Sequence, residues 1–381
     1  MKQLSVLVKP ASFHCNLRCS YCFYTDVSQM RVGQAPGMMG IDTAALLISR
    51  IFAYLAVGDQ LEIIFQGGEP TLRGLDFYQT FIGLVHTGQS SKNVAVSYVL
   101  QTNGTLLDDS WGTFLKEHHF LVGLSIDGWQ DLHDSCRVDV AGQGSFDLVE
   151  KGRAILDKYE IPYNVLMVLT EQMAAKPEQI WEFICQSSLE YVQFIPCLAP
   201  LGQGKGLSQA VTPSAFVSFY IQLLPLWLEK MKRGNYISIK LFDDIYNQFA
   251  YARLTACGQS GRCQLQYVIE ADGSIYPCDF YALDEYRMGT LAENPWKVLW
   301  SSRGARNFLS QESRSHLHKH QICQNCIYAG FCGGGCRRMQ DTIYGEIGKN
   351  CAYRQLLNEF LPHMAEIRYA LQNLQVGDRA C

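Results

Sequence analysis

The chain has 381 residues, a formal net charge of −4 and 48% hydrophobic residues. This length suffices for two or three domains, and the hydrophobic content supports a large buried core. The sequence has no run of lysine and arginine typical of nucleic-acid or lipid-headgroup surfaces, and no apolar run long enough to span a bilayer. We therefore expect neither nucleic acid nor a membrane as a partner.

The cysteine content bears on the cellular compartment. The N-terminal residues lack the apolar core of a signal peptide, so we expect a cytoplasmic protein. Fifteen cysteines in a reducing compartment are better explained as metal ligands or redox groups than as disulfides.

The first predicted element is a strand over residues 4–8, and three cysteines follow it closely: Cys15, Cys19 and Cys22. Thiolates bind soft metals, and a cubane iron–sulfur cluster takes four of them, so three leave one iron open to a substrate. A zinc site normally gathers four ligands as two close pairs, which this C-x3-C-x2-C spacing does not match. The alternatives are a chance grouping on a loop, or a zinc knuckle completed by His14.

This triplet, followed by Phe23 and Tyr24, resembles the signature of the radical S-adenosylmethionine (SAM) enzymes. The resemblance implies that the open iron chelates the amino and carboxylate groups of SAM. Reductive cleavage of SAM would then yield a 5′-deoxyadenosyl radical.

Helical and strand patterns alternate through the next part of the chain. Further strands are predicted at residues 61–65, 94–100, 121–126, 163–169 and 191–195, and helices at 42–57, 75–86, 109–118, 146–159 and 177–187. Asp42 is the predicted N-cap of the first of these helices. Six strand–helix units imply a parallel sheet, which places ligands at the carboxyl ends of its strands. We therefore predict an α/β fold with a partial (β/α)6 barrel over residues 1–234.

The turn Gly67-Gly68-Glu69-Pro70 follows the strand at 61–65. Adjacent glycines let the backbone approach a ligand closely, and the carboxylate could bind an ammonium group. The alternative is a tight turn that only ends the strand. Beside the cysteine triplet, this turn resembles the GGEP motif of radical SAM enzymes, which contacts the amino group of SAM.

Three residues near other strand ends are weaker candidates when each is taken alone. A serine such as Ser125 is usually a local cap, an arginine such as Arg137 usually a surface charge, and an apolar residue such as Leu198 usually part of the core.

The second half of the chain differs in composition. An amphipathic helix is predicted over residues 213–232, and a transitional segment runs through Arg253. Eight cysteines follow, enough for two complete four-thiolate clusters: Cys257, Cys263, Cys278, Cys323, Cys326, Cys332, Cys336 and Cys351. Two zinc sites are the alternative, because C-x2-C pairs serve both metals.

Between these cysteines, residues 267–270 and 274–277 predict a small β-hairpin. We expect the region at 235–381, which ends in a helix, to be a second domain with little core of its own. Such a domain would depend on metal for its fold.

The spacing of these cysteines resembles the SPASM domain, which binds two auxiliary [4Fe–4S] clusters. Over nearly its whole length the chain resembles the anaerobic sulfatase-maturating enzymes, in the motifs KPAS (9–12), FQGGEPTL (65–72), LQTNGTL (100–106), FLVGLSIDG (120–128) and YPCDFY (276–281). These enzymes make Cα-formylglycine from a cysteine or serine of a sulfatase. The resemblance therefore implies three [4Fe–4S] clusters, SAM, a sulfatase polypeptide as substrate, and an electron donor such as flavodoxin or ferredoxin.

The resemblance also implies a role for each site residue. Cys15, Cys19 and Cys22 would hold the radical-generating cluster, and the SAM pocket would be lined by Tyr21, Gly68, Ser125, Arg137 and Leu198. The first auxiliary cluster would be held by Cys257, Cys263, Cys278 and Cys336, and the second by Cys323, Cys326, Cys332 and Cys351. The spacing alone does not reveal that Cys336 serves a different cluster from its neighbours.

Asp279, directly after Cys278, matches the general base of the family. After hydrogen abstraction from the substrate Cβ, the thiol or hydroxyl must lose a proton before an electron can leave to an auxiliary cluster. A carboxylate within hydrogen-bond reach could take that proton. Without the resemblance, an aspartate in this place would be interpreted as a solvated turn residue.

Two other functions stay open at this point. Related SPASM enzymes modify ribosomally made peptides with the same cysteine framework, and a zinc-binding structural or partner-binding protein is the alternative from another class. An iron–sulfur enzyme predicts a brown protein that dithionite bleaches, whereas a zinc protein would be colourless. The sequence does not distinguish a cysteine-type from a serine-type sulfatase substrate.

Overall fold

The computed structural model describes residues 2–32, 36–201, 209–310, 321–344 and 351–377. The chain forms two compact units, each assembled from separate stretches of sequence. The first unit comprises Met1–Ile126, His133–Tyr163 and Gln264–Ser310, and the second comprises Asp127–Leu132, Asn164–Cys263 and Gln311–Cys381. The domain boundary expected after Gly234 stays a prediction.

A parallel sheet forms the core of the first unit. Four strands lie side by side, in the order of the chain: β1 (Gln3–Val8), β2 (Gln60–Phe65), β3 (Ala95–Thr102) and β4 (Leu121–Ser125). Their register pairs Val8 with Phe65 and Phe65 with Leu100. The carboxyl ends of these strands therefore meet at one edge of the sheet, as the sequence predicted.

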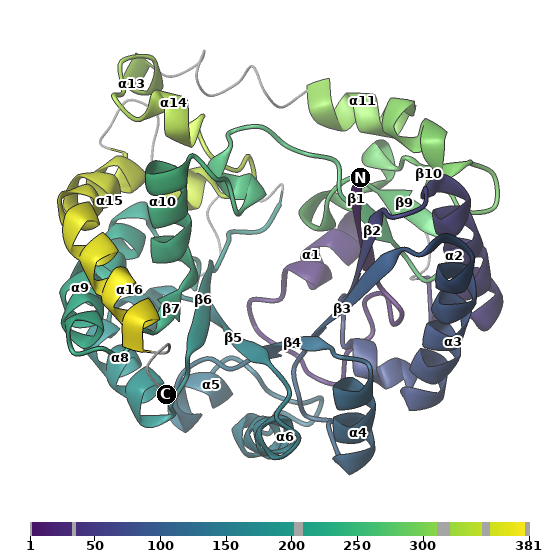
Figure 1. Ribbon diagram of the computed structural model, residues 1–381, viewed down its shortest axis with the longest axis horizontal. Coiled ribbons are helices and arrows are strands. Elements are labelled where there is room, and N and C mark those ends of the chain that lie inside the picture. Colours follow the sequence, from purple (N-terminus) through teal and green to yellow (C-terminus); the bar gives the residue numbers. More distant parts are fainter. Residues whose placement is uncertain (1, 33–35, 202–208, 311–320, 345–350, 378–381) are drawn as a thin grey trace. The chain divides into compact units, whose positions relative to one another are not determined.

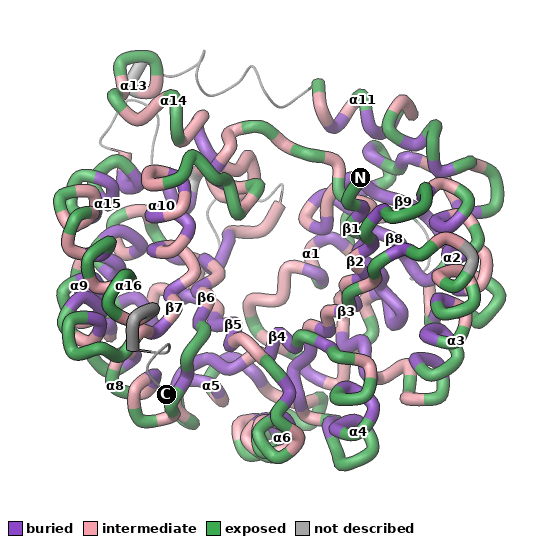
Figure 2. The backbone as a smooth tube through the Cα atoms, in the orientation of Figure 1, coloured by how far each residue is buried: buried purple, intermediate pink, exposed green. Residues whose placement is uncertain are grey.

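Helices connect and cover these strands (Figure 1), and the longer ones are α1 (Phe23–Met30), α2 (Ile41–Tyr54), α3 (Leu75–Lys92), α4 (Asp109–Glu117), α6 (Phe146–Lys158) and α11 (Arg303–Ser310). Buried and exposed residues alternate along α3 and α4 in Figure 2, as expected for helices that turn one face to a core. The predicted N-cap of α2 is wrong by two residues: Gly40 is the cap. Asp42 instead lies in the first turn, where a carboxylate favours the helix dipole.

The predicted β-hairpin is present, but its setting corrects the expectation that it lacks a core. Its strands are β8 (Tyr267–Ile269) and β9 (Ser274–Tyr276), and β10 (Gly289–Thr290) pairs with β9. β8 runs parallel to β1, with Val8 opposite Ile269, so the hairpin extends the sheet of the first unit. Val268, Ile269 and Ile275 are 0% exposed. Hydrophobic burial, and not metal alone, holds this segment.

The second unit contains most of β5 (Tyr163–Leu169), followed by β6 (Tyr191–Pro196) and β7 (Ser238–Ile239), which pair in parallel. Its longer helices are α8 (Pro177–Gln186), α9 (Pro213–Lys232), α10 (Lys240–Tyr251), α15 (Ala352–Phe360) and α16 (Met364–Gly377). The bounds of α9 are those predicted, whereas α10 lies in the segment that was expected to be transitional. Trp227 of α9 is 1% exposed, packs near Phe360 of α15, and donates a hydrogen bond of 2.7 Å to the Ile237 carbonyl.

The prediction of an α/β fold built on parallel strands is confirmed. None of the helices in the described part of the chain combines the length and hydropathy that crossing a bilayer requires.

Candidate active site

The cysteine triplet lies between β1 and α1 in the first unit. Cys15, Cys19 and Cys22 are partly buried, and their thiols lie close enough for their charges to interact. Burial is the main cause that raises the pKa of Cys15 to about 12; the other two thiols add to it, while the Leu17 N–H opposes it. With its pKa raised in this way, the Cys15 thiol holds negative charge well only beside a cationic centre such as iron.

The triplet loop is held against residues 136–139. The Arg18 N–H donates to the Val138 carbonyl at 2.6 Å, and the Ser20 N–H donates to the Cys136 carbonyl at 3.0 Å. This pairing brings Arg137 to the triplet. Its Nη1 lies 4.0 Å from Cys19 Sγ, and its guanidinium lies 5.5 Å from the centre of the Tyr21 ring. Two of the predicted SAM-pocket residues thus lie beside the predicted cluster ligands.

The two glycines of the 67–70 turn pack against the triplet loop. The Gly68 N–H donates to the Ser12 carbonyl at 2.8 Å. A Cβ on Gly68 would lie 2.0 Å from the His14 carbonyl oxygen, and a Cβ on Gly67 would lie 2.8 Å from Lys9 Cγ. The close backbone approach that these glycines permit is therefore made to the protein itself, which the motif alone did not indicate.

Glu69 has a structural role that the sequence interpretation did not include. Its buried carboxylate accepts hydrogen bonds from the Thr71 and Thr102 hydroxyls at 2.6 and 2.8 Å. The N–H of Asn103 donates to the other oxygen at 2.7 Å. Burial raises the pKa of Glu69, and these donors oppose the increase. The carboxylate joins the ends of β2 and β3 beside the cysteine loop.

Asn103 was not predicted as a site residue. Its Nδ2 lies 3.8 Å from Cys15 Sγ and donates to Asn16 Oδ1 at 2.9 Å. The available signal was its position directly after a strand, in the LQTNG segment.

Asp279 lies in a buried polar cluster within the first unit. Its Oδ2 accepts hydrogen bonds from the Tyr24 hydroxyl at 2.6 Å and from Gln66 Nε2 at 3.0 Å. Its Oδ1 lies 2.7 Å from Lys9 Nζ. The residue is 7% exposed, so it is a buried group and not the solvated turn residue of the alternative interpretation.

The partners of Asp279 come from three elements. Lys9 directly follows β1, Gln66 directly follows β2, and Tyr24 lies in the first turn of α1. Burial raises the pKa of Tyr24 well above its usual value, and the neighbouring Asp279 carboxylate adds to this effect. Tyr24 is therefore protonated and donates. Lys9 and Gln66 were not singled out in the sequence, although each occupies the carboxyl end of a strand.

The other predicted SAM-pocket residues lie at strand ends. Ser125 is the last residue of β4. Leu198 belongs to the second unit, follows β6 and is 9% exposed. Their part in binding SAM stays a prediction.

Several cysteines of the C-terminal region lie near one another in the second unit. The thiol of Cys323 interacts electrostatically with Cys351 and Cys326, and Cys332 interacts with Cys351 and Cys323. Burial is the main cause that raises the pKa of each of Cys323, Cys332 and Cys351.

The first auxiliary set is partly assembled in the same unit. Cys257 interacts electrostatically with Cys336, and the assignment of both to one cluster stays a prediction. A Cβ on Gly258 would lie 3.6 Å from Cys336 Cβ, so the two segments are in contact. Cys263 belongs to this unit, whereas Cys278 belongs to the first.

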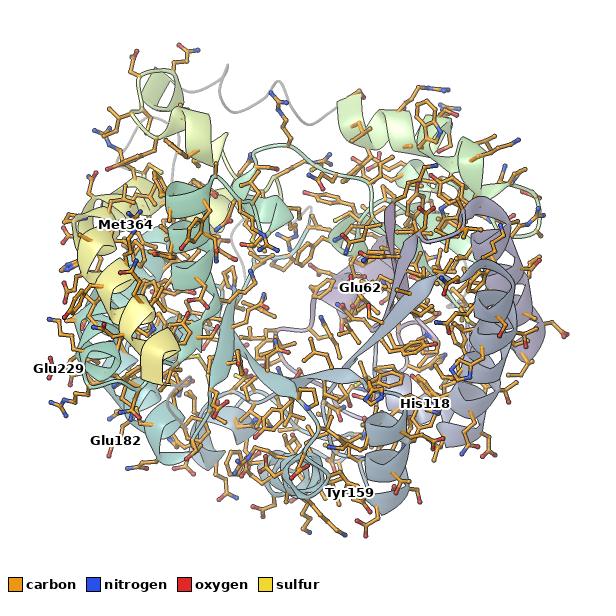
Figure 3. The ribbon with its side chains drawn as sticks, in the orientation of Figure 1. Glu62, His118, Tyr159, Glu182, Glu229 and Met364 are labelled. Atoms are coloured by element: carbon orange, nitrogen blue, oxygen red, sulfur yellow. The ribbon has the colours of Figure 1, made fainter. Side chains whose placement is uncertain are left out.

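The donor chemistry of these sets fits iron–sulfur clusters, because every member is a thiol. Among the described residues, no three cysteine, histidine or acidic side chains gather as a site for a single metal ion. A surface groove of the first unit lies elsewhere, between α3 and α4, and includes His86 and His118. His118 is labelled in Figure 3. None of the predicted site residues lines it.

The chain matches two family descriptions. Residues 10–184 match the Radical SAM superfamily, and residues 257–327 match an iron–sulfur cluster-binding domain, SPASM. Together with the parallel strands and the thiol sets, these matches define the chain as a radical SAM enzyme with a SPASM domain. It binds SAM and iron–sulfur clusters.

Similarity to known proteins indicates which family within this class the chain resembles. The chain is 37% identical over 345 residues to the cysteine-type anaerobic sulfatase-maturating enzyme of Clostridium novyi, covering 90% of each protein. It is 29% identical over 396 residues to the serine-type enzyme of Bacteroides thetaiotaomicron, covering 98% of the chain and 93% of the relative. The structure of native anSMEcpe with bound AdoMet and Kp18Cys peptide is similar, with a TM-score of 0.85 and 33% identity over 97% of this chain and 99% of that one.

The chain belongs to the anaerobic sulfatase-maturating enzymes. It is a radical SAM oxidoreductase that forms formylglycine from a cysteine or serine. The expected fold, family and reaction are thereby confirmed.

Proposed function

We propose that this enzyme acts on a cysteine-type sulfatase, in an unfolded or extended segment. The observation that carries this choice is a difference in similarity. Three cysteine-type relatives are 36–37% identical to the chain, whereas three serine-type relatives are 29–30% identical. The peptide-bound structure of anSMEcpe supports a peptide as the form in which substrate binds.

The proposed cofactors are three [4Fe–4S] clusters and SAM. Cys15, Cys19 and Cys22 would hold the first cluster, and the two SPASM sets described above would hold the others. When bound, these groups supply a 5′-deoxyadenosyl radical that removes a hydrogen atom from the substrate Cβ, together with an acceptor for one electron. Arg137 and Tyr21 would contribute to SAM binding, and the position of Arg137 beside Cys19 and the Tyr21 ring supports this assignment.

Asp279 is the proposed general base. The 11% exposure of its side chain supports this role, and its Oδ1 lies 2.7 Å from Lys9 Nζ. Tyr24 and Gln66 hold the other oxygen, which fixes the direction of the carboxylate. Loss of the thiol proton to Asp279 would prepare the substrate for release of an electron, as the formation of a carbonyl-type product requires.

We further propose the cytoplasm as the location, and a flavodoxin or ferredoxin as the electron donor. The number of cysteines, most of which belong to the predicted ligand sets, supports a reducing compartment.

Anaerobic mass spectrometry of sulfatase-motif peptides tests the substrate proposal. Two peptides differing only in cysteine or serine at the modified position are incubated with reconstituted enzyme, SAM and dithionite. We expect the cysteine peptide to exchange its thiol for an aldehyde, with little or no loss of two hydrogens from the serine peptide. Faster conversion of the serine peptide would overturn the cysteine-type proposal.

A third outcome would favour another substrate. If 5′-deoxyadenosine accumulates while neither peptide changes, the radical chemistry stands and a different ribosomal peptide becomes the expected substrate.

A further inference from the structure

We infer that Lys9 is a positioning residue for the reaction, and that Glu270 and Arg31 hold Lys9 in place. The inference rests on the proposed role of Asp279 as base. All four residues belong to the first unit.

Lys9 is fixed by its backbone and its stem. Its N–H donates to the Ile269 carbonyl at 2.8 Å, which continues the pairing of β1 with β8. Its side-chain carbons pack against Gly67, where a Cβ would lie only 2.8 Å from Lys9 Cγ. The side chain is 0% exposed. Lysine is almost never fully buried unless it is paired, so a specific role for the ammonium group is indicated.

The ammonium group of Lys9 lies among two carboxylates and two aromatic rings. Its Nζ is 2.7 Å from Asp279 Oδ1 and 3.3 Å from Glu270 Oε1. It also lies 4.6 Å from the centre of the Tyr24 ring and 5.4 Å from that of Phe13. Burial alone would lower the pKa of Lys9, but Asp279 and Glu270 outweigh this effect and raise it, so the group stays charged.

Arg31 contacts the same oxygen of Glu270 as Lys9. Its Nη1 lies 3.2 Å from Glu270 Oε1, and its Nη2 donates to the Tyr276 hydroxyl at 2.8 Å. Charges therefore alternate along Arg31, Glu270, Lys9 and Asp279. The Glu270 and Lys9 side chains are 0% exposed, whereas those of Arg31 and Asp279, at the two ends, are 10% and 11% exposed. Lys9 and Glu270 thus form the buried centre of this row of charges.

The second carboxylate gives Lys9 a partner besides Asp279. Glu270 Oε1 lies 3.3 Å from Lys9 Nζ and 3.2 Å from Arg31 Nη1, so the ammonium group is held independently of Asp279. A buried ammonium without such a partner would be costly. Lys9 therefore directs Oδ1 of Asp279 from a fixed position.

Substitution of Lys9 tests this role. In Lys9→Met, we expect kcat for formylglycine formation to fall at least about tenfold, a modest share of what a positioned base contributes. We expect the KM for the peptide and the iron content to change less than about twofold. SAM cleavage should continue, so the ratio of 5′-deoxyadenosine to formylglycine should rise. Lys9→Arg should restore part of kcat, and the exposed Lys116→Met should match the parent enzyme.

A double-mutant cycle separates positioning from a general loss of structure. In the Asp279→Asn background, Lys9→Met should cause no further loss of kcat, because its effect passes through Asp279. Full, independent losses from the two substitutions would overturn the inference. A Lys9→Met enzyme with the parent's kcat and the parent's ratio of 5′-deoxyadenosine to formylglycine would also overturn it.

Two further variants keep the test decisive. If Lys9→Met does not fold, the double variant Lys9→Met/Glu270→Gln replaces it, because this variant removes one charge of each sign. In the double-mutant cycle it is then compared with Glu270→Gln instead of the parent enzyme. An active Asp279→Asn enzyme would refute the proposed base, and the inference with it. If Asp279→Asn is inactive while Lys9→Met is fully active, the proposed role of Lys9 is refuted and that of Asp279 stands.

Discussion

At the scale of single residues, Asp279 is defined by its surroundings more than by its place in the sequence. A carboxylate that is 7% exposed and held at Oδ2 by Tyr24 and Gln66 has a fixed direction. Fixed direction is what a general base needs, because proton transfer requires hydrogen-bond geometry in the reacting complex.

We predict that Asp279→Asn lowers formylglycine formation about a hundredfold to ten-thousandfold, since an amide cannot take the proton. The variant should keep its iron and still cleave SAM, because Asp279 follows a predicted ligand but is not itself a member of the predicted sets. The measurements are product by mass spectrometry, 5′-deoxyadenosine by chromatography, and bound iron. Parent-like turnover would remove Asp279 from the mechanism.

Gly68 provides a second prediction at this scale. Gly68→Ala places a Cβ within 2.0 Å of the His14 backbone oxygen, which cannot move without displacing the loop before Cys15. We expect a loss of roughly 1–3 kcal/mol in the free energy of unfolding, together with reduced iron.

Gly83→Ala is the matched control for this prediction. Gly83 lies in α3, and the Cβ that the substitution adds would have no neighbouring atom within 4 Å, so the change should be neutral or slightly stabilising. Comparison of thermal unfolding and iron content decides the question, and equal behaviour of the two variants would contradict the packing role of Gly68.

At the scale of elements, β1 is the strand on which the site depends. β2 lies on one side of it and β8 on the other, and Lys9 and the triplet loop follow its end. The hairpin β8–β9 therefore supports the active site. Cys278 and Asp279 also follow shortly after β9 in the chain.

Val268 in β8 tests this structural role. Val268→Ala removes two methyl groups from a side chain that is 0% exposed, and we expect a loss of roughly 2 kcal/mol in the free energy of unfolding. Val57→Ala, at a residue 75% exposed, is the same chemical change on the surface and should have little effect. A similar unfolding midpoint for both variants in anaerobic thermal denaturation would show that the hairpin is not part of the core.

At the scale of the whole molecule, the chain crosses between its two units more than once. Residues 264–310 return to the first unit, and residues from 311 onward belong to the second. The four cysteines of the predicted second auxiliary set all belong to the second unit.

Iron content provides a prediction at this scale. Three [4Fe–4S] clusters require about 12 irons per chain, and Cys323→Ala should remove about four of them while the rest remain bound. Cys185→Ala, at a partly buried thiol outside the predicted sets, should leave the iron content unchanged. Iron assays and electron paramagnetic resonance of the reduced proteins check both expectations, and an unchanged count in Cys323→Ala would exclude that residue as a ligand.

The sequence by itself determined the parts of this protein that depend on local pattern. Apolar periodicity located the strands of the parallel fold and most of the longer helices, including both ends of α9. It missed α1 and α10, and α3 continues to Lys92, beyond its predicted end at residue 86. The unusual cysteine spacing indicated the family, because few chemistries use three thiols in that arrangement. Both signals are carried by residues close together in the chain.

Only the tertiary structure decided what depends on distant residues. Lys9 and Asp279 are 270 positions apart, yet they lie at 2.7 Å because β8 pairs with β1. The same pairing buried a hairpin that had been expected to depend on metal, and packed Gly67 against the stem of Lys9. Strand order across a sheet is set by long-range hydrophobic packing, which leaves no local pattern at either residue.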